Sequence, residues 1–248
     1  MLREGFAIFP DILQQKLVLR LREALESTYP SYREIHNRMG YTGETEGGAH
    51  HILIHKGYFL QLLQELDVIE YIKEYLGGQI IVNSYGAFDN VRGNKLYLKK
   101  CHRDVRSFEH DPRMLNLLVM LDEFTIENGA TYMLAGSHLV DLRPEEDLFF
   151  LNAARAVGGA GSILLFDSRL WHAAGSNTTD QHRRAITITF TRPYFKQQFD
   201  YCRAMGHDFC ETLPESLKQL IGFYSRVPAD LEEWYQPLQK RFYKSNQD

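Results

Sequence analysis

The chain has 248 residues, of which 44% are hydrophobic and 24% are charged, and its formal net charge is -4. This composition is typical of a globular protein, and the weak negative charge argues against the concentrated basic surface that nucleic acids usually require. Cys101, Cys202 and Cys210 form a poor disulfide framework, and we find neither a signal peptide nor an apolar run that could cross a bilayer. We therefore expect a cytoplasmic protein without a nucleic-acid or membrane partner.

The first part of the chain is predicted to be mostly helical. Residues 6–9 form a short strand in this prediction, and Asp11 with Gln14 makes a capping box for the helix that follows. Leucines then recur at helical spacing, at Leu13, Leu17, Leu21 and Leu25. The polar, glycine-rich residues 41–51 predict a loop. A second helix ends at Gly77-Gly78, and its apolar face is formed by Leu62, Leu66, Ile69, Ile72 and Leu76.

The pattern then changes to short strands separated by turns. The predicted strands cover residues 80–85, 96–102, 115–121, 131–134, 162–166 and 185–191. No helical pattern alternates with them, so we expect a barrel or a double-sheet jelly roll rather than a parallel α/β sheet. Helix returns from about residue 195, and Phe223-Tyr224 and Trp234-Tyr235 are expected to pack on the β core. We predict one mainly β domain with flanking helices: a helical part over 1–78, a β core over 79–194 and a helical extension over 195–248.

Two strand-like segments carry residues that can bind a metal. His102 and Asp104 are two residues apart, so on a strand their side chains would point to the same face. His172 follows the apolar strand that ends at Phe166, and a barrel can bring it beside this pair. Two imidazoles and one carboxylate form the facial triad of non-haem Fe(II) oxygenases, which leaves positions open for a bidentate 2-oxo acid and O2.

A 2-oxo acid with a second carboxylate needs a cation at the far end of its pocket. Arginine suits this role, because its planar guanidinium binds a carboxylate through two hydrogen bonds and stays charged. Arg183 comes eleven residues after His172, at the start of the next predicted strand. We expect its side chain near the metal and the side chain of Arg184 on the opposite face.

Several stretches of this sequence resemble the phytanoyl-CoA dioxygenase family: CHRD, LDEFTIENGATYMLAGSH and GSILLFDSRLWHAAGSNTTDQHRRAITITF. The opening GFAIFPDILQQKLVLRLREAL is also similar to the start of that family, so the resemblance runs from residue 5 to about residue 194. It implies a double-stranded β-helix (jelly-roll, cupin-like) core and a dioxygenase that uses Fe(II), 2-oxoglutarate and O2. It also implies that His102, Asp104 and His172 are catalytic iron ligands and that Arg183 binds 2-oxoglutarate.

The resemblance also bears on the reaction and on the remaining cosubstrate contacts. Related halogenases replace the carboxylate ligand with a small residue, so Asp104 favours hydroxylation or another oxidation. Some members carry a Ser two residues after the second His and one class stacks a Trp near 2-oxoglutarate, whereas this chain has Ala174 and Leu118. We therefore expect Asn116 and Ser84 to supply polar contacts to the cosubstrate.

Other interpretations of the same residues stay open. A cupin-like metalloenzyme could use these ligands without 2-oxoglutarate, and a degenerate barrel could bind metal without catalysis, although intact ligands argue against the latter. The partner is expected to be a small-molecule substrate, selected by residues 41–56, 103–113 and 143–156. Clustered Arg103, Arg106 and Arg113 suit an anionic substrate or one linked to CoA or another carrier, although solubilising surface arginines are the preferred interpretation. His50 and His51 are either exposed or part of a loop that covers the pocket.

Overall fold

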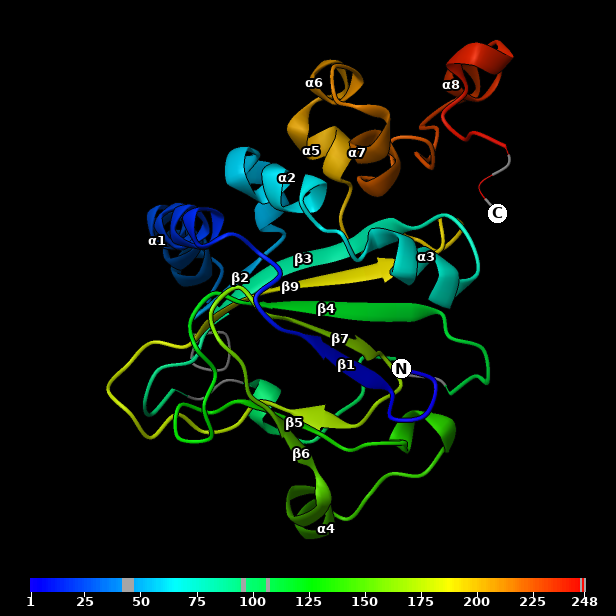
Figure 1. Ribbon diagram of the computed structural model, residues 1–248. Helices are drawn as coiled ribbons and strands as arrows, with labels where there is room; N and C mark the ends of the chain where they lie inside the picture. Colours follow the sequence, from blue (N-terminus) through cyan, green and yellow to red (C-terminus); the bar gives the residue numbers. More distant parts are fainter. Residues whose placement is uncertain (42–46, 95–96, 106–107, 246, 248) are drawn as a thin grey trace.

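The structure, a computed structural model, describes residues 1–41, 47–94, 97–105, 108–245 and 247. Figure 1 shows two β-sheets with a layer of helices over the outer face of the larger sheet. The smaller sheet and a short helix, α4 (Glu146–Asn152), lie on the opposite side of the larger sheet. The mainly β architecture with flanking helices that the sequence predicts is confirmed.

Both sheets are antiparallel and join strands that are far apart in the sequence. The larger, six-stranded sheet has the order β1-β7-β4-β9-β3-β2. Its strands are β1 (Phe6–Phe9), β2 (Gly48–His50), β3 (Ile81–Asp89), β4 (Met114–Met120), β7 (Ile163–Asp167) and β9 (Arg184–Thr191). The three-stranded sheet has the order β6-β5-β8, with β5 (Thr131–Met133), β6 (Ala154–Ala156) and β8 (His172–Ala173).

Alternate residues of the larger sheet face different surroundings, because successive side chains of a strand point to opposite faces. On β4, Leu115 and Leu117 are buried in the main hydrophobic core, which they share with the helical layer. Asn116 and Leu118 face the other way and line a cavity. One strand therefore contributes to the core with one face and to a candidate site with the other.

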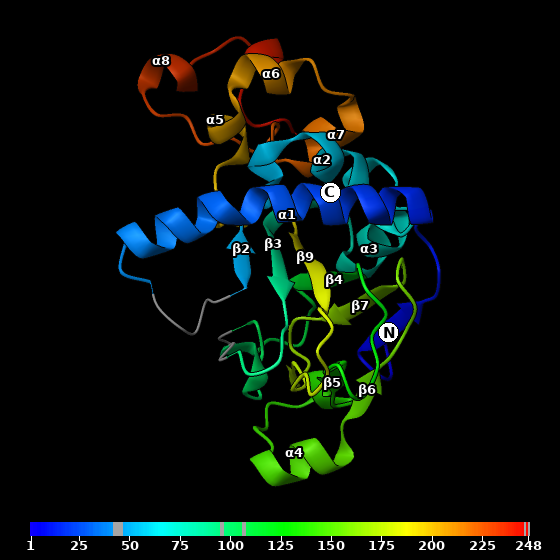
Figure 2. The same cartoon turned by 90° about the vertical axis from the view of Figure 1, so that its left-hand side faces the viewer.

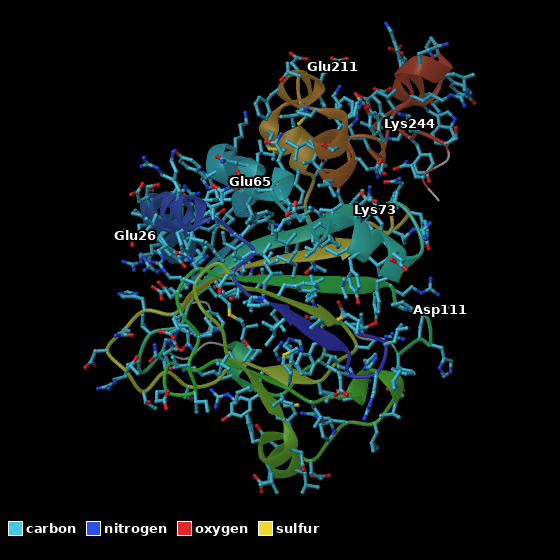
Figure 3. The ribbon with its side chains drawn as sticks, in the orientation of Figure 1. Glu26, Glu65, Lys73, Asp111, Glu211 and Lys244 are labelled. Carbon is cyan, nitrogen blue, oxygen red and sulfur yellow. The ribbon has the colours of Figure 1, made fainter. Side chains whose placement is uncertain are left out.

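Helices cover the outer face of the larger sheet. They are α1 (Gln15–Arg38), α2 (Gly57–Gln64) and α3 (Ile69–Leu76), with α5 (Tyr201–Met205), α6 (His207–Glu211) and α7 (Glu215–Leu220) stacked beyond them, while α8 (Leu231–Trp234) lies apart from the sheet (Figure 1). Leu21 and Leu25 of α1 are buried against the core, while Glu26 of the same helix points outward (Figure 3). In the described part of the chain, no helix combines the length and the apolar character that crossing a membrane would require.

Two helix boundaries differ from the prediction. Gln14 rather than Asp11 occupies the N-cap position of α1, without a capping side-chain hydrogen bond. Asp11 has a φ of 52°, and its backbone N–H donates to Ser162 Oγ. The predicted helix through residues 62–76 is two helices, because the turn closed by the Glu65 N–H ends α2 and α3 begins only after Val68. Gly77 ends α3 in the left-handed conformation, as predicted.

Some segments also have a different structure from the one expected. The predicted strand over 96–102 is wrong in its described part: residues Tyr97–Lys99 form a 3-10 helix, and His102 makes only an isolated bridge, to His172. Residue 96 lies outside the described residues, as do 42–46 of the predicted 41–51 loop. The rest of that loop contains β2, and the 143–156 segment that was expected to select the substrate contains α4 and β6.

The C-terminal extension packs mainly on the helical layer. Figure 2 shows α5, α6 and α7 stacked over α2, and the extension adds Tyr201 and Leu217 to the main core. Phe223 packs against this core as expected. Trp234 and Tyr235 are 61% and 76% exposed, so the expectation that this pair packs on the β core was wrong. Trp234 ends α8 and Tyr235 is its C-cap, and this helix has only four residues, none of them buried.

Candidate functional site

The structure brings His102, Asp104 and His172 together. Each can offer one ligand atom, and these atoms all lie within 4.8 Å of one another. The two imidazole Nε2 atoms lie 3.7 Å (His102) and 3.6 Å (His172) from opposite carboxylate oxygens of Asp104. A single ion could therefore contact all three side chains.

Backbone pairing rather than a shared strand holds the two imidazoles. The N–H groups of His102 and His172 each donate to the carbonyl of the other residue, at 3.0 Å. Their Nδ1 atoms lie 2.7 Å from the Lys100 carbonyl and 3.0 Å from the Leu170 carbonyl. A proton on each Nδ1 leaves the Nε2 lone pair directed at the centre, which is how metal-binding histidines are commonly oriented.

A chain of polar side chains restrains the carboxylate of Asp104. The Nδ2 atom of Asn116 donates to Asp104 Oδ2 at 2.6 Å. Its Oδ1 accepts from Thr189 Oγ1 at 2.8 Å, and Ser84 Oγ donates to Thr189 Oγ1 at 3.0 Å. Asn116 and Ser84, expected to contact the cosubstrate, therefore also connect β4, β9 and β3 to the candidate ligand.

The surroundings of these groups fit a divalent transition metal. His102 Nε2 is buried and has no hydrogen-bond partner within the part of the chain that the structure describes. Burial lowers the pKa of His172, against the opposing effect of Asp104, so its imidazole is neutral near pH 7. Asp104 is exposed on one side, which leaves an approach to the centre. Two neutral nitrogens and one carboxylate are the donor set of non-haem iron sites.

Arg183 lies in the same cavity as the three candidate ligands, which has a volume of about 230 Å³. Only 4% of this residue is exposed, and its guanidinium lies 4.4 Å from the ring centre of Phe124. Burial lowers the pKa of Arg183 to about 10, so the side chain remains a cation at neutral pH. Among the described residues its Nε has no acceptor, so it is available to an anionic ligand.

Arg184 points away from the cavity, as the strand alternation predicts. Its guanidinium forms ion pairs with Asp122 and Glu26 on the helical side of the sheet. The two neighbouring arginines therefore provide a matched pair, one facing the cavity and one facing the outer surface.

The rest of the cavity wall was only partly predicted. Leu118 and Ala174, the two departures from the family pattern, both line it, and so do His50 and His51. Thr187 and Thr189 were missed, although their alternation with the isoleucines of β9 could have revealed them. Gln198, beyond the last strand, also lines the cavity, and no sequence signal points to it.

Residues 1–185 match the model of a protein family described as phytanoyl-CoA dioxygenase (PhyH). Over 262 aligned residues, covering 98% of this chain and 92% of the relative, the sequence is 31% identical to an uncharacterized protein of Mycobacterium tuberculosis. It is 27% identical to the dioxygenase af480 of Aspergillus fumigatus over 177 residues, which cover 66% of this chain and 55% of that protein.

Solved structures of non-haem, α-ketoglutarate-dependent enzymes share the fold. The carbocyclase SnoK from nogalamycin biosynthesis matches with a TM-score of 0.59 and 19% identity, over 76% of this chain and 80% of SnoK. The epimerase SnoN from the same biosynthesis matches with a TM-score of 0.57 and 18% identity, over 76% of this chain and 78% of SnoN. The fold is therefore the double-stranded β-helix of these oxygenases.

Proposed function

The chain belongs to the phytanoyl-CoA dioxygenase family, and we propose that it is an Fe(II)- and 2-oxoglutarate-dependent dioxygenase that hydroxylates an unactivated C–H bond of a small-molecule metabolite. The observation that carries the proposal is the convergence of His102, Asp104 and His172 on one point of a cavity that also contains the buried Arg183, whose Nε has no acceptor among the described residues. Enzymes of this fold also catalyse other oxidations, so hydroxylation is the specific part of the proposal.

The proposed roles follow from the contacts of each side chain. His102, Asp104 and His172 hold Fe(II) on one side, and Arg183 pairs with the distal carboxylate of 2-oxoglutarate. When bound, the iron, 2-oxoglutarate and O2 supply the oxidising chemistry, in which the substrate C–H becomes C–OH and 2-oxoglutarate becomes succinate and CO2. Asp104 occupies the position that a halide takes in the related halogenases, which favours hydroxylation.

The protein's own contribution is orientation and exclusion of water. The backbone carbonyls of Lys100 and Leu170 fix the imidazole rings, and Asn116 fixes the carboxylate. Phe166 packs beside His172, with ring centres 4.8 Å apart, and Leu118 adds apolar surface to the same cavity. These contacts keep the ligand geometry defined before the cosubstrate binds, which lowers the cost of ordering it.

The proposal is tested with the purified chain under controlled O2. Anaerobic addition of Fe(II) and 2-oxoglutarate is expected to give a metal-to-ligand charge-transfer absorption band, and O2 is expected to start succinate release. O2 consumption without any need for 2-oxoglutarate would instead indicate a cupin-like metalloenzyme. Metal binding with neither the band nor succinate would indicate a non-catalytic barrel.

A further inference from the structure

The rim of the cavity is built jointly by the N-terminal half and the C-terminal extension. His51 lines the cavity and has a left-handed backbone, with φ 59° and ψ 34°, which is uncommon for a residue other than glycine. Its Nδ1 lies 3.1 Å from the hydroxyl of Tyr201, and its ring stacks on Phe199 at 4.6 Å and 19°. An uncommon backbone conformation in a residue whose ring is held by two partners indicates a functional role.

The residues that hold His51 come from beyond the part of the chain that matches the family model. That match ends at residue 185, whereas Phe199 and Tyr201 lie on the segment that leaves β9 and enters α5. The segment is fixed to the sheet by the N–H of Gln198, which donates to the Asn83 carbonyl at 3.2 Å. Tyr201 is fully buried in the main core. The rim is therefore a rigid feature of this chain.

The hydrogen bonds around Tyr201 define what His51 can offer to a ligand. Burial raises the pKa of Tyr201, so its phenol keeps its proton. At 3.1 Å the Tyr201 O–H is placed to donate to His51 Nδ1. Burial and neighbouring His50 lower the pKa of His51 to about 4, so its ring is neutral, and with Tyr201 as the donor its one proton lies on Nε2. His51 thus presents a hydrogen-bond donor.

The non-histidine charges among the described lining residues of the cavity are those assigned above to the proposed iron and cosubstrate. These charged groups are Asp104 and Arg183. Arg103 lies outside the lining and binds Asp141 and the Ser137 carbonyl, while Arg113 pairs with Glu109. Arg106 lies outside the described residues. The remaining described lining residues are apolar or neutral, with Phe88, Leu98, Met114, Thr131 and Thr187 among them.

On the basis of the function proposed above, we infer that the enclosed part of the substrate is an uncharged, oxygen-bearing carbon skeleton. A carbonyl or ether oxygen of this group accepts a hydrogen bond from His51 Nε2, and the skeleton packs on the apolar walls. A charged group in this position would be desolvated without a counter-ion, which is strongly unfavourable. His51 is the specificity-determining residue, and Tyr201 is the residue that positions it.

The inference can be tested by binding, without turnover. The full chain is loaded with Zn²⁺, which does not support redox chemistry, and with 2-oxoglutarate. Saturation-transfer NMR is then recorded with two compound pools. The neutral pool contains uncharged cyclic ketones, lactones and methylated sugars, and the charged pool contains free amino acids, carboxylic acids and acyl-CoA thioesters. We expect saturation transfer to members of the neutral pool only.

Variants then assign the binding to His51. His51→Leu is expected to weaken binding of the neutral compounds about tenfold or more, the usual effect of losing one hydrogen bond to a buried partner. His51→Asn tolerates the left-handed backbone and keeps an N–H donor, so it should restore most of the affinity. Tyr201→Phe is expected to have an intermediate effect, and Tyr235→Phe, at an exposed tyrosine, serves as the matched control.

The outcomes separate this inference from the proposed function. Selective binding of the charged pool, or neutral binding that is the same in His51→Leu and in the unaltered chain, overturns the inference. The NMR signals of 2-oxoglutarate report cosubstrate binding in the same samples. Loss of saturation transfer to 2-oxoglutarate would overturn the proposed function, whichever pool binds.

Discussion

The two faces of the six-stranded sheet share one backbone, but one face forms the hydrophobic core and the other borders the cavity. The outer face packs leucines, isoleucines and valines against the helical layer and forms the main core. The inner face carries Asn116, Thr187 and Thr189 among its apolar residues and borders a cavity. Neighbouring residues of one strand therefore have different roles. A substitution on the outer face should lower stability, and a substitution at the next position should affect ligand binding.

The largest expected effect is a loss of activity, and it comes from a residue that lines the cavity. His172→Ala removes one of three candidate ligands, and succinate release should fall to the level of a reaction without enzyme, because two ligands cannot hold the iron in the required geometry. Cooperative thermal unfolding should persist. His110→Ala, at an exposed histidine outside the cavity, is the control. Retained succinate release in His172→Ala would disprove the assignment of this ligand.

The next test compares two adjacent leucines of β4. Leu117 is fully buried in the core, and Leu117→Ala should lower the free energy of unfolding by about 2–5 kcal/mol, the usual cost of such a cavity. Leu118 is 7% exposed beside an existing cavity, so Leu118→Ala should cost less in stability and change substrate turnover instead. Urea denaturation and succinate release measure both properties. Equal losses of stability would contradict the separation of the faces.

The neighbouring arginines allow a similar comparison at the start of β9. Arg183→Met should raise the KM for 2-oxoglutarate about 10- to 100-fold, since a hydrogen bond to a charged group contributes about 1.5–3 kcal/mol. Arg184→Met should leave this KM unchanged and reduce stability through the loss of its ion pairs with Asp122 and Glu26. Succinate release at varied 2-oxoglutarate concentrations gives the KM. An unchanged KM in Arg183→Met would favour an enzyme that does not use 2-oxoglutarate.

These pairs also show which parts of the molecule could be predicted from the sequence. Alternation within one strand is a local property, so the opposite directions of Arg183 and Arg184 followed from the sequence alone. The proximity of His102 and His172 was also anticipated, but for the wrong local reason. The segment before His102 is a 3-10 helix, and the two residues are joined by an isolated bridge that depends on the tertiary fold.

Contacts between distant segments set the limit of such prediction. The 143–156 region was expected to select the substrate and was given no strand, yet Ala154–Ala156 pairs with β5, whose edge is visible only in the folded molecule. The contact of Tyr201 with His51 spans 150 residues and has no periodicity that could reveal it. The rim therefore had to be found in the structure, whereas the candidate ligands stand out in the sequence.

The smallest expected effect is on the pH dependence of stability. It concerns the contact between Tyr201, which lies in the main core, and His51, which lines the cavity. The pKa of His51 is lowered from 6.5 to about 4, by burial first and by His50 second. The unfolded chain therefore binds a proton near pH 6.5 that the folded chain does not. The contribution of neutral His51 is fully present above pH 6.5 and is lost as the pH falls toward 4.

This linkage predicts that the Tm depends differently on pH in the unaltered chain and in His51→Asn. The Tm of the unaltered chain should fall between pH 6.5 and 4, and the Tm of His51→Asn should fall less over the same window, because Asn does not titrate. Burial also lowers the pKa values of His50, His55, His138 and His172, but these residues are present in both proteins and contribute to both curves. Differential scanning calorimetry at matched ionic strength measures the difference. Parallel curves would mean that folding does not shift the pKa of His51, which would contradict the burial of its ring at the rim.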